Sequence, residues 1–221
     1  MQDYNYMETN CFEITLELGC SKYPPAKDLP RYWEENRKSL LNFILQAHEG
    51  IKGFVFGYQD GEVKPLSNAI IMVMNVTSRR NPELINHPIY SNKKGDYFRL
   101  LTKGRYFVAA MQPGFYPAFW VAHVPEAPDL DSRHFHEATK MNFLLIKADK
   151  STPYGNDEYV EKATRLIPPT FRTSFVLGSE ERAWLDHFLE QLQGSSEVIA
   201  MRHEEFSELL TPLEESLGFL E

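Results

Sequence analysis

The most regular short pattern in the chain is an alternation of apolar and polar residues over residues 11–18. From Phe12 to Leu18 every second side chain is apolar, and the positions between them hold two glutamates and a threonine. Successive side chains of a β-strand point to opposite faces of the sheet. The alternation therefore predicts a strand with one apolar and one polar face.

A helical pattern follows this segment. Pro24, Pro25 and Pro30 mark a loop and the start of a helix, and Gly50 marks its end. Between them the apolar residues recur at helical spacing, namely Leu29, Trp33, Leu40, Leu41, Ile44 and Ala47. We expect one helix here, ending before Gly50.

Between residue 51 and about residue 148 the pattern changes to short apolar runs separated by glycine and proline turn signals. Short strands at regular spacing are typical of an antiparallel β-sandwich. Residues 77–94 are polar and rich in Asn and Pro, so we expect a long loop there. The fold class predicted for the whole chain is thus mixed.

The last segment is acidic. Between residues 178 and 221 there are eleven Asp and Glu against Arg182 and Arg202, a net charge of −9 in a chain whose total is −8. Apolar spacing predicts one helix over 179–193 and a weaker one over 196–210. A solvated helical tail and an interaction arm are both consistent with this charge.

Composition and charge exclude several classes of protein. With 43% hydrophobic and 24% charged residues in 221, the chain has a globular composition. It has no cluster of Lys and Arg that would follow a nucleic-acid backbone. No apolar run approaches the ~20 residues that span a bilayer, so no transmembrane segment is expected. The polar first ten residues do not resemble a signal peptide, and these features alone indicate a cytosolic protein.

Cys11 and Cys20 are the two cysteines of the chain. If residues 11–18 form a strand, nine residues separate the two thiols by roughly 30 Å, whereas a disulfide needs Cα atoms within about 7 Å. They are then either buried free thiols or residues whose partners lie outside this chain.

Glu13 and Glu17 would be about 13 Å apart, too far for a retaining-glycosidase pair. Spacing alone leaves each of them as a solvated or salt-bridged carboxylate.

Several longer motifs resemble a known family. Residues 1–6, Met-Gln-Asp-Tyr-Asn-Tyr, and residues 9–24, which contain Thr-Leu-Glu-Leu, closely resemble the end of the catalytic domain of the N/E subfamily of zinc metallocarboxypeptidases. Residues 32–41 and 48–55 continue the resemblance. In that subfamily a transthyretin-like β-sandwich follows, and three further segments resemble it, namely Asn86-His-Pro, residues 95–101 and Lys103-Gly-Arg-Tyr. No resemblance is seen beyond about residue 150.

This resemblance implies three segments. Residues 1–50 would be the C-terminal strand and helix of an α/β carboxypeptidase domain. Residues 51–148 would be the transthyretin-like sandwich, and residues 149–221 an acidic, partly helical tail. The sandwich is large enough to fold alone. We therefore expect protection from hydrogen exchange to concentrate in residues 51–148, unless residues 1–50 dock on the sandwich or on a partner.

The resemblance also implies an activity. The family removes single C-terminal residues, usually Lys or Arg, from peptides and proteins by means of a zinc-bound water. Matching by motif, Glu17 falls on the catalytic glutamate that takes a proton from this water and passes it to the leaving amine. Gln2 and Thr15 fall on positions that line the pocket for the departing side chain. Glu17 favours similarity to the active members, because some relatives that lack it serve only as binding proteins.

The zinc ligands of the family, a His-x-x-Glu pair and a later His, precede the Met-Gln-Asp motif at which this chain starts. One local match, His134-Phe-His-Glu137, lies at the edge of the expected sandwich, where a solvated loop is the favoured interpretation. We therefore expect zinc in the complete enzyme and none bound by this chain, which would be a C-terminal fragment or a truncated gene model without activity of its own.

An upstream signal peptide and an extracellular or secretory location follow from that interpretation, as do upstream partners for the two cysteines. Asn75-Val-Thr77 is then a candidate glycosylation site. The expected partners are peptides or proteins with basic C-termini, and the oligomeric state is left open. The alternative function is a non-catalytic binding or structural module built on the sandwich and the acidic tail.

Overall fold

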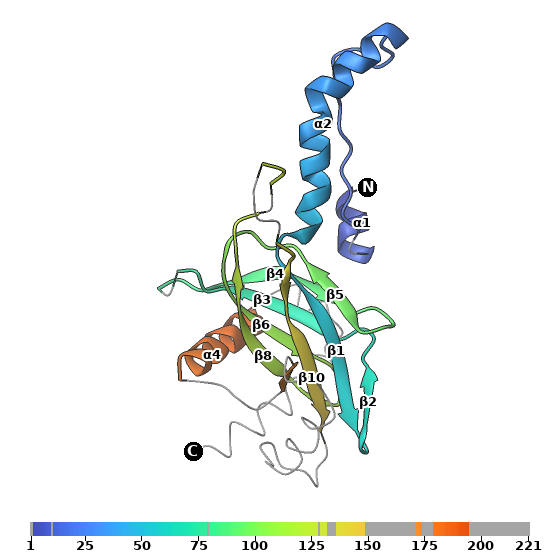
Figure 1. Ribbon diagram of the computed structural model, residues 1–221. Helices are drawn as coiled ribbons and strands as arrows, with labels where there is room; N and C mark the ends of the chain where they lie inside the picture. The colour runs from blue at the N-terminus through green and yellow to red at the C-terminus, as the bar shows by residue number, and fades with distance from the viewer. Residues whose placement is uncertain are drawn as a thin grey trace.

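The computed structural model describes residues 2–9, 11–78, 80–127, 129–131, 136–148, 171–173 and 179–194, and its centre is a pair of facing β-sheets (Figure 1). The larger sheet has the strand order β11-β10-β1-β2, and three short strands also pair with it. Its strands are β1 (Ile51–Gln59), β2 (Glu62–Pro65), β5 (Asp96–Arg99), β7 (Phe115–Tyr116), β9 (Thr139–Lys140), β10 (Asn142–Lys147) and β11 (Phe171–Thr173). The second sheet has the order β4-β3-β6-β8, with strands β3 (Ile70–Asn75), β4 (Glu83–Tyr90), β6 (Gly104–Met111) and β8 (Ala118–Val124).

The core lies between the two sheets. Along β3, Ile71 and Val73 point into this core, where they join Val55 of β1 and Phe143 of β10. The alternate residues of β3 are also buried, in a second cluster on the opposite face of the sheet. A strand that is covered on both faces needs apolar residues at consecutive positions, not at alternate ones. This explains the uninterrupted run in β3.

A helix covers that opposite face. Helix α4 (Ser179–Gly194) lies against the second sheet, and Trp184, Leu185, Phe188 and Leu192 are buried there. The helix expected over 179–193 is therefore confirmed, but a solvated tail is wrong for this segment. Its acidic residues Glu180, Asp186 and Glu190 lie on the exposed face. Helix α4 is therefore amphipathic, and the helix expected over 196–210 lies outside the described residues, as do the acidic residues beyond Gly194.

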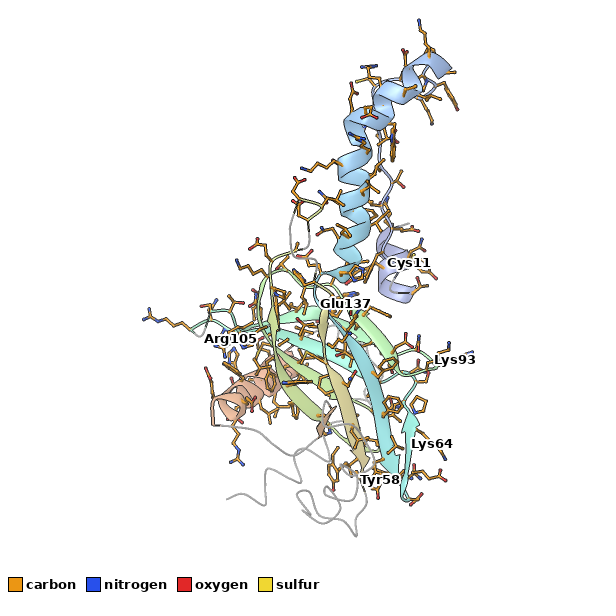
Figure 2. The ribbon with its side chains drawn as sticks, viewed as in Figure 1. Cys11, Tyr58, Lys64, Lys93, Arg105 and Glu137 are labelled. Atoms are coloured by element: carbon orange, nitrogen blue, oxygen red, sulfur yellow. The ribbon has the colours of Figure 1, made fainter. Side chains whose placement is uncertain are left out.

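Polar contacts hold the two ends of α4. Near its N-terminus the Arg105 guanidinium of β6 lies 5.3 Å from the centre of the Trp184 ring and 4.0 Å from Glu180 (Figure 2). Near its C-terminus the Gln191 side chain accepts a hydrogen bond from the Leu84 amide of β4 at 2.6 Å and donates one to the Pro82 carbonyl at 3.1 Å. These contacts fix the position of α4 along the sheet.

Two expectations for the sandwich need correction. Residues 77–94 are not one long loop, because β4 occupies Glu83–Tyr90 in the middle of the segment. Among the described strands β4 is an edge strand that pairs only with β3, so it tolerates Pro88 and polar residues that would disrupt a central strand. In addition, the larger sheet is mixed, because β1 and β10 pair in parallel. The other sheet is antiparallel throughout.

The first fifty residues differ most from expectation. Residues 2–9 form helix α1 (Gln2–Thr9), and residues 11–18 have no regular structure and are largely exposed. The strand prediction for residues 11–18 is wrong in this structure, because a strand needs a neighbouring strand to satisfy its backbone groups and the described residues offer none beside it. Residues 11–18 thus have the alternating pattern of a strand but do not pair with any described sheet.

The helix expected up to Gly50 is confirmed. Helix α2 (Leu29–Leu45) is preceded by the short 3₁₀ turn η1 (Ala26–Asp28) and followed by η2 (Gln46–His48). Figure 1 shows α2 projecting from one end of the sandwich, and it contains no buried residue. It contacts the segment before β9, where the Leu130 amide donates to Asn42 Oδ1 at 2.9 Å and Lys38 pairs with Asp131. None of the described helices is both long and apolar enough to cross a membrane.

Candidate active-site segment

The residues predicted to do chemistry lie at the N-terminal end of the chain, beyond the sandwich. Thr15 and Glu17 are exposed in the irregular segment 11–18, and Gln2 is half-buried at the start of α1. Among the described residues, these three side chains share no hydrogen bond or ion pair. The structure thus leaves the candidate general base in solvent, without the enclosed surroundings that a catalytic carboxylate uses.

Two hydrogen bonds connect the segment 11–18 with α1. The side-chain amide of Asn5 donates to the Glu13 carboxylate at 2.5 Å, and the backbone amide of Cys11 donates to the Asn5 carbonyl at 3.2 Å. Glu13 is exposed, and its carboxylate accepts this hydrogen bond at the surface of the molecule. The two contacts tie the start of the segment that carries Thr15 and Glu17 to the helix that carries Gln2.

The thiols do not match one of the two interpretations left open by the sequence. Cys11 and Cys20 are both free and both exposed, so buried free thiols are excluded. Figure 2 shows Cys11 beside α1, away from the sandwich core. Because residues 11–18 do not form a strand, the separation of roughly 30 Å inferred from strand geometry does not apply to this structure.

The candidate glycosylation site is well ordered by its neighbours. Asn75, at the end of β3, is half-buried, and its Oδ1 accepts a hydrogen bond from the Thr77 amide at 2.9 Å. The Thr77 hydroxyl in turn accepts from the Arg105 amide at 2.9 Å and donates to the Arg105 carbonyl at 3.3 Å. Glycosylation of Asn75 stays a prediction.

The described residues do not form a zinc site. No group of three or more His, Cys, Asp or Glu within the described part of the chain is placed to hold a metal ion. Of the local His-x-x-Glu match, His134 lies outside the described residues, and Glu137 is engaged in ion pairs. Its carboxylate lies 2.9 Å from Lys140 Nζ and 3.1 Å from Lys52 Nζ (Figure 2). Both lysines compete with any cation for this carboxylate.

These pairs predict an unusual titration of Glu137. Hydrogen bonds from Lys140 and then Lys52 lower the pKa of its carboxyl to about 2, from the ordinary 4.5. The stabilisation from the depressed pKa is complete above pH 4.5 and is lost as the pH falls through about 2. We expect Lys140→Met to raise the midpoint measured by NMR of the side-chain carboxyl carbon. Equal midpoints in the two proteins would contradict the pairing.

Comparison with known proteins identifies the N-terminal segment. The sequence profile of the zinc carboxypeptidase family matches residues 1–39, which include Gln2, Thr15 and Glu17. Carboxypeptidase D of Rattus norvegicus is 36% identical over 216 residues, which cover 95% of this chain and 14% of that protein. The carboxypeptidase N catalytic chain of Homo sapiens is 46% identical over 135 residues, which cover 61% of this chain and 27% of the relative. The chain corresponds to part of a zinc metallocarboxypeptidase of the N/E subfamily.

The coverage of these alignments adds two facts about this metallocarboxypeptidase segment. It spans about a seventh of the rat relative and about a quarter of the human one. Because the rat alignment covers 95% of the chain, it includes most of the acidic segment, where no resemblance is seen from the motifs alone. Among solved structures, the shaft pilin SpaA from Lactobacillus rhamnosus GG matches 46% of this chain and 50% of its own at 12% identity and a TM-score of 0.33, which carries no argument.

Sequence reasoning overlooked the residues that join the N-terminal segment to the sandwich. Tyr6 of α1 contacts Arg99 of β5 and His87 of β4. Arg99 is 5% exposed, and it is one of the two buried polar or charged residues of the described chain, with Ser91. Its signal in the sequence is weak, since an arginine at the end of a short strand usually indicates a solvent-exposed position.

Proposed function

We propose that the complete protein is a zinc metallocarboxypeptidase that removes C-terminal Lys or Arg from peptides and proteins, and that this chain supplies part of its active site. In this proposal Glu17 is the general base, which accepts a proton during attack of water and returns it to the leaving amine. Gln2 and Thr15 line the pocket for the departing side chain. The family match over residues 1–39 carries the proposal, since it spans all three positions.

The exposed apolar surface of the N-terminal segment supports the division at about residue 50. Helix α2 has the apolar pattern of a packed helix, yet Trp33 is 51% exposed and Ile44 is 66% exposed. Ile14 and Leu16 of the neighbouring segment are exposed as well. Large apolar surfaces of this kind mark contacts with further protein. We propose that the remainder of a peptidase domain covers α2 and supplies the strand beside residues 11–18.

The zinc ligands belong, in this proposal, to that remainder, because the ligands of the family that this chain resembles precede the motif that residues 1–3 match. The chain alone is then inactive and binds no zinc. Residues 51–148 are assigned to a transthyretin-like sandwich, with α4 as a helical cover from the acidic region 149–221. We further propose an extracellular or secretory location and glycosylation at Asn75.

A non-catalytic binding or structural module is the second candidate. One observation favours it, namely a sandwich whose two sheets bury an apolar core between them. Mapping of the transcript discriminates between the two candidates. An in-frame upstream exon that encodes His-x-x-Glu favours the enzyme, whereas ribosome occupancy at a start codon for Met1 favours the module.

Activity of the longer protein is the direct test. We expect the protein that includes this segment to release arginine from a peptide ending in Arg, to act poorly on a matched peptide ending in Glu, and to lose activity after chelation of zinc. The purified 221-residue chain should release nothing. No release by the longer protein would contradict the enzyme proposal, and release by the chain alone would contradict the assignment of the zinc ligands to another segment.

A further inference from the structure

We infer that Arg99 is a positioning residue of the active site: from inside the sandwich it holds Tyr6, and through Tyr6 it fixes the helix and the segment that carry Gln2, Thr15 and Glu17. The inference rests on the proposed function for those three residues. Its basis in the structure is the contact between Arg99 and Tyr6, which joins two parts of the chain that are 93 residues apart in sequence.

Arg99 is buried in the sandwich, and its Nε has no hydrogen-bond partner among the described residues. It is the last residue of β5, where it pairs with Ile51 of β1, and it is 5% exposed. Its Nη1 donates a hydrogen bond to the Tyr6 hydroxyl at 2.8 Å. A guanidinium removed from water requires acceptors for its N–H groups, and the loss of one leaves a buried donor unsatisfied. Arg99 and the Tyr6 hydroxyl are thus energetically coupled.

The ring of Tyr6 lies among further contacts. Its centre is 4.8 Å from that of the His87 ring in β4 and 5.8 Å from that of the Phe12 ring. Tyr6 therefore contacts strands of both sheets and also the first residues of the segment 11–18. An aromatic side chain with an apolar body and one polar atom suits such a position, because the ring packs while the hydroxyl reaches the buried arginine.

The position of Tyr6 determines where its neighbours lie. Gln2 is four residues earlier, so the two side chains share one face of α1. Asn5, the residue before Tyr6, holds Glu13 and Cys11 through the hydrogen bonds described above. Helix α1 has eight residues, and a helix this short is marginal without tertiary contacts. Its order, and the placement of Gln2 and of the segment leading to Glu17, thus depend on the contact with Arg99.

Hydrogen exchange of the full chain tests the coupling. In Tyr6→Phe, which removes only the hydroxyl, we expect α1 to exchange at least about fivefold faster while the sandwich strands are unchanged. Arg99→Met should give the same acceleration in α1, and the double variant should be no faster than either single variant. Tyr4→Phe is the matched control, because Tyr4 lies on the same helix and is 67% exposed. Equal exchange of α1 in Tyr6→Phe and in the unsubstituted chain would overturn the inference.

Kinetics of the longer protein test the positioning role separately. Tyr6→Phe should lower kcat/KM for a peptide ending in Arg by about tenfold, whereas Tyr4→Phe should leave it unchanged. Arg99→Lys should also lower kcat/KM, because an ammonium does not reproduce the geometry of the guanidinium. Faster exchange of α1 with unchanged kcat/KM would overturn the positioning role and leave the proposed function intact. A longer protein without peptidase activity would contradict the proposed function, and the exchange experiment would still test the coupling.

Discussion

Replacement of Phe188 with alanine is expected to lower the free energy of unfolding by about 3–5 kcal/mol. Phe188 is fully buried between α4 and the second sheet, and its ring meets the Phe107 ring edge-on with centres 6.0 Å apart. Truncation removes the apolar contacts and leaves a cavity that the surrounding strands can fill only in part. Urea unfolding monitored by tryptophan fluorescence measures the change, since Trp184 belongs to the same cluster.

The matched control for this prediction is Arg182→Ala, an exposed position of the same helix. Both substitutions introduce a good helix former, so a difference between them reports packing and not helix propensity. We expect Arg182→Ala to change the free energy of unfolding by less than about 0.5 kcal/mol. If α4 were a solvated tail, both variants would unfold at the urea concentration of the unsubstituted chain, and the contacts of α4 with the sheet would be contradicted.

The acidic helix illustrates which part of the fold was accessible from sequence. The spacing of Trp184, Leu185, Phe188 and Leu192 located the helix and its apolar face, because periodicity is a local property. What that face contacts is not local. The net charge suggested solvent, and the sheet face that α4 covers is formed by strands that end more than fifty residues earlier. The side chains on this face include Met72 and Met74 of β3. They belong to an uninterrupted apolar run, so the sequence pattern does not distinguish them from the residues that face the other sheet.

The same distinction explains the two segments that were predicted wrongly. Residues 11–18 have the alternation of a strand, but pairing depends on a neighbour that the described structure does not contain. In β4 the reverse holds, because Asn86 and Pro88 weaken the strand pattern while pairing with β3 still forms. In both cases the presence or absence of a neighbouring strand determined whether a strand formed. The residue pattern of the segment itself contains no information about that neighbour.

For the candidate site, the sequence supplied the residues through resemblance and left their arrangement undetermined. Gln2, Thr15 and Glu17 belong to motifs that the family match covers, so their identity was accessible. The contact of Tyr6 with Arg99 was not, because it joins a helix and a strand far apart in sequence. It also bears on hydrogen exchange, since α1 docks on the sandwich and should share some of its protection, whereas α2 has no buried residue.

Substitution of Glu17 by glutamine in the longer protein is expected to lower kcat for release of C-terminal arginine by at least about 10²-fold. Glutamine has the shape of glutamate and retains a hydrogen-bond acceptor, but it cannot take up a proton at neutral pH. If Glu17 only bound substrate, the change would appear mainly in KM. Urea unfolding of the longer protein is the accompanying measurement: an unchanged free energy of unfolding in Glu17→Gln shows that lost activity reports chemistry and not misfolding.

The control for Glu17→Gln is Glu13→Gln, four residues earlier in the same exposed segment. A glutamine at this position still offers an oxygen to the Asn5 amide, which now donates to the Glu13 carboxylate at 2.5 Å, so the link between the segment and α1 is preserved. The variant also removes the same charge. We therefore expect Glu13→Gln to keep a kcat close to that of the unsubstituted protein. Equal turnover by both variants would remove Glu17 from the role of general base, because proton transfer is the one property that the comparison isolates.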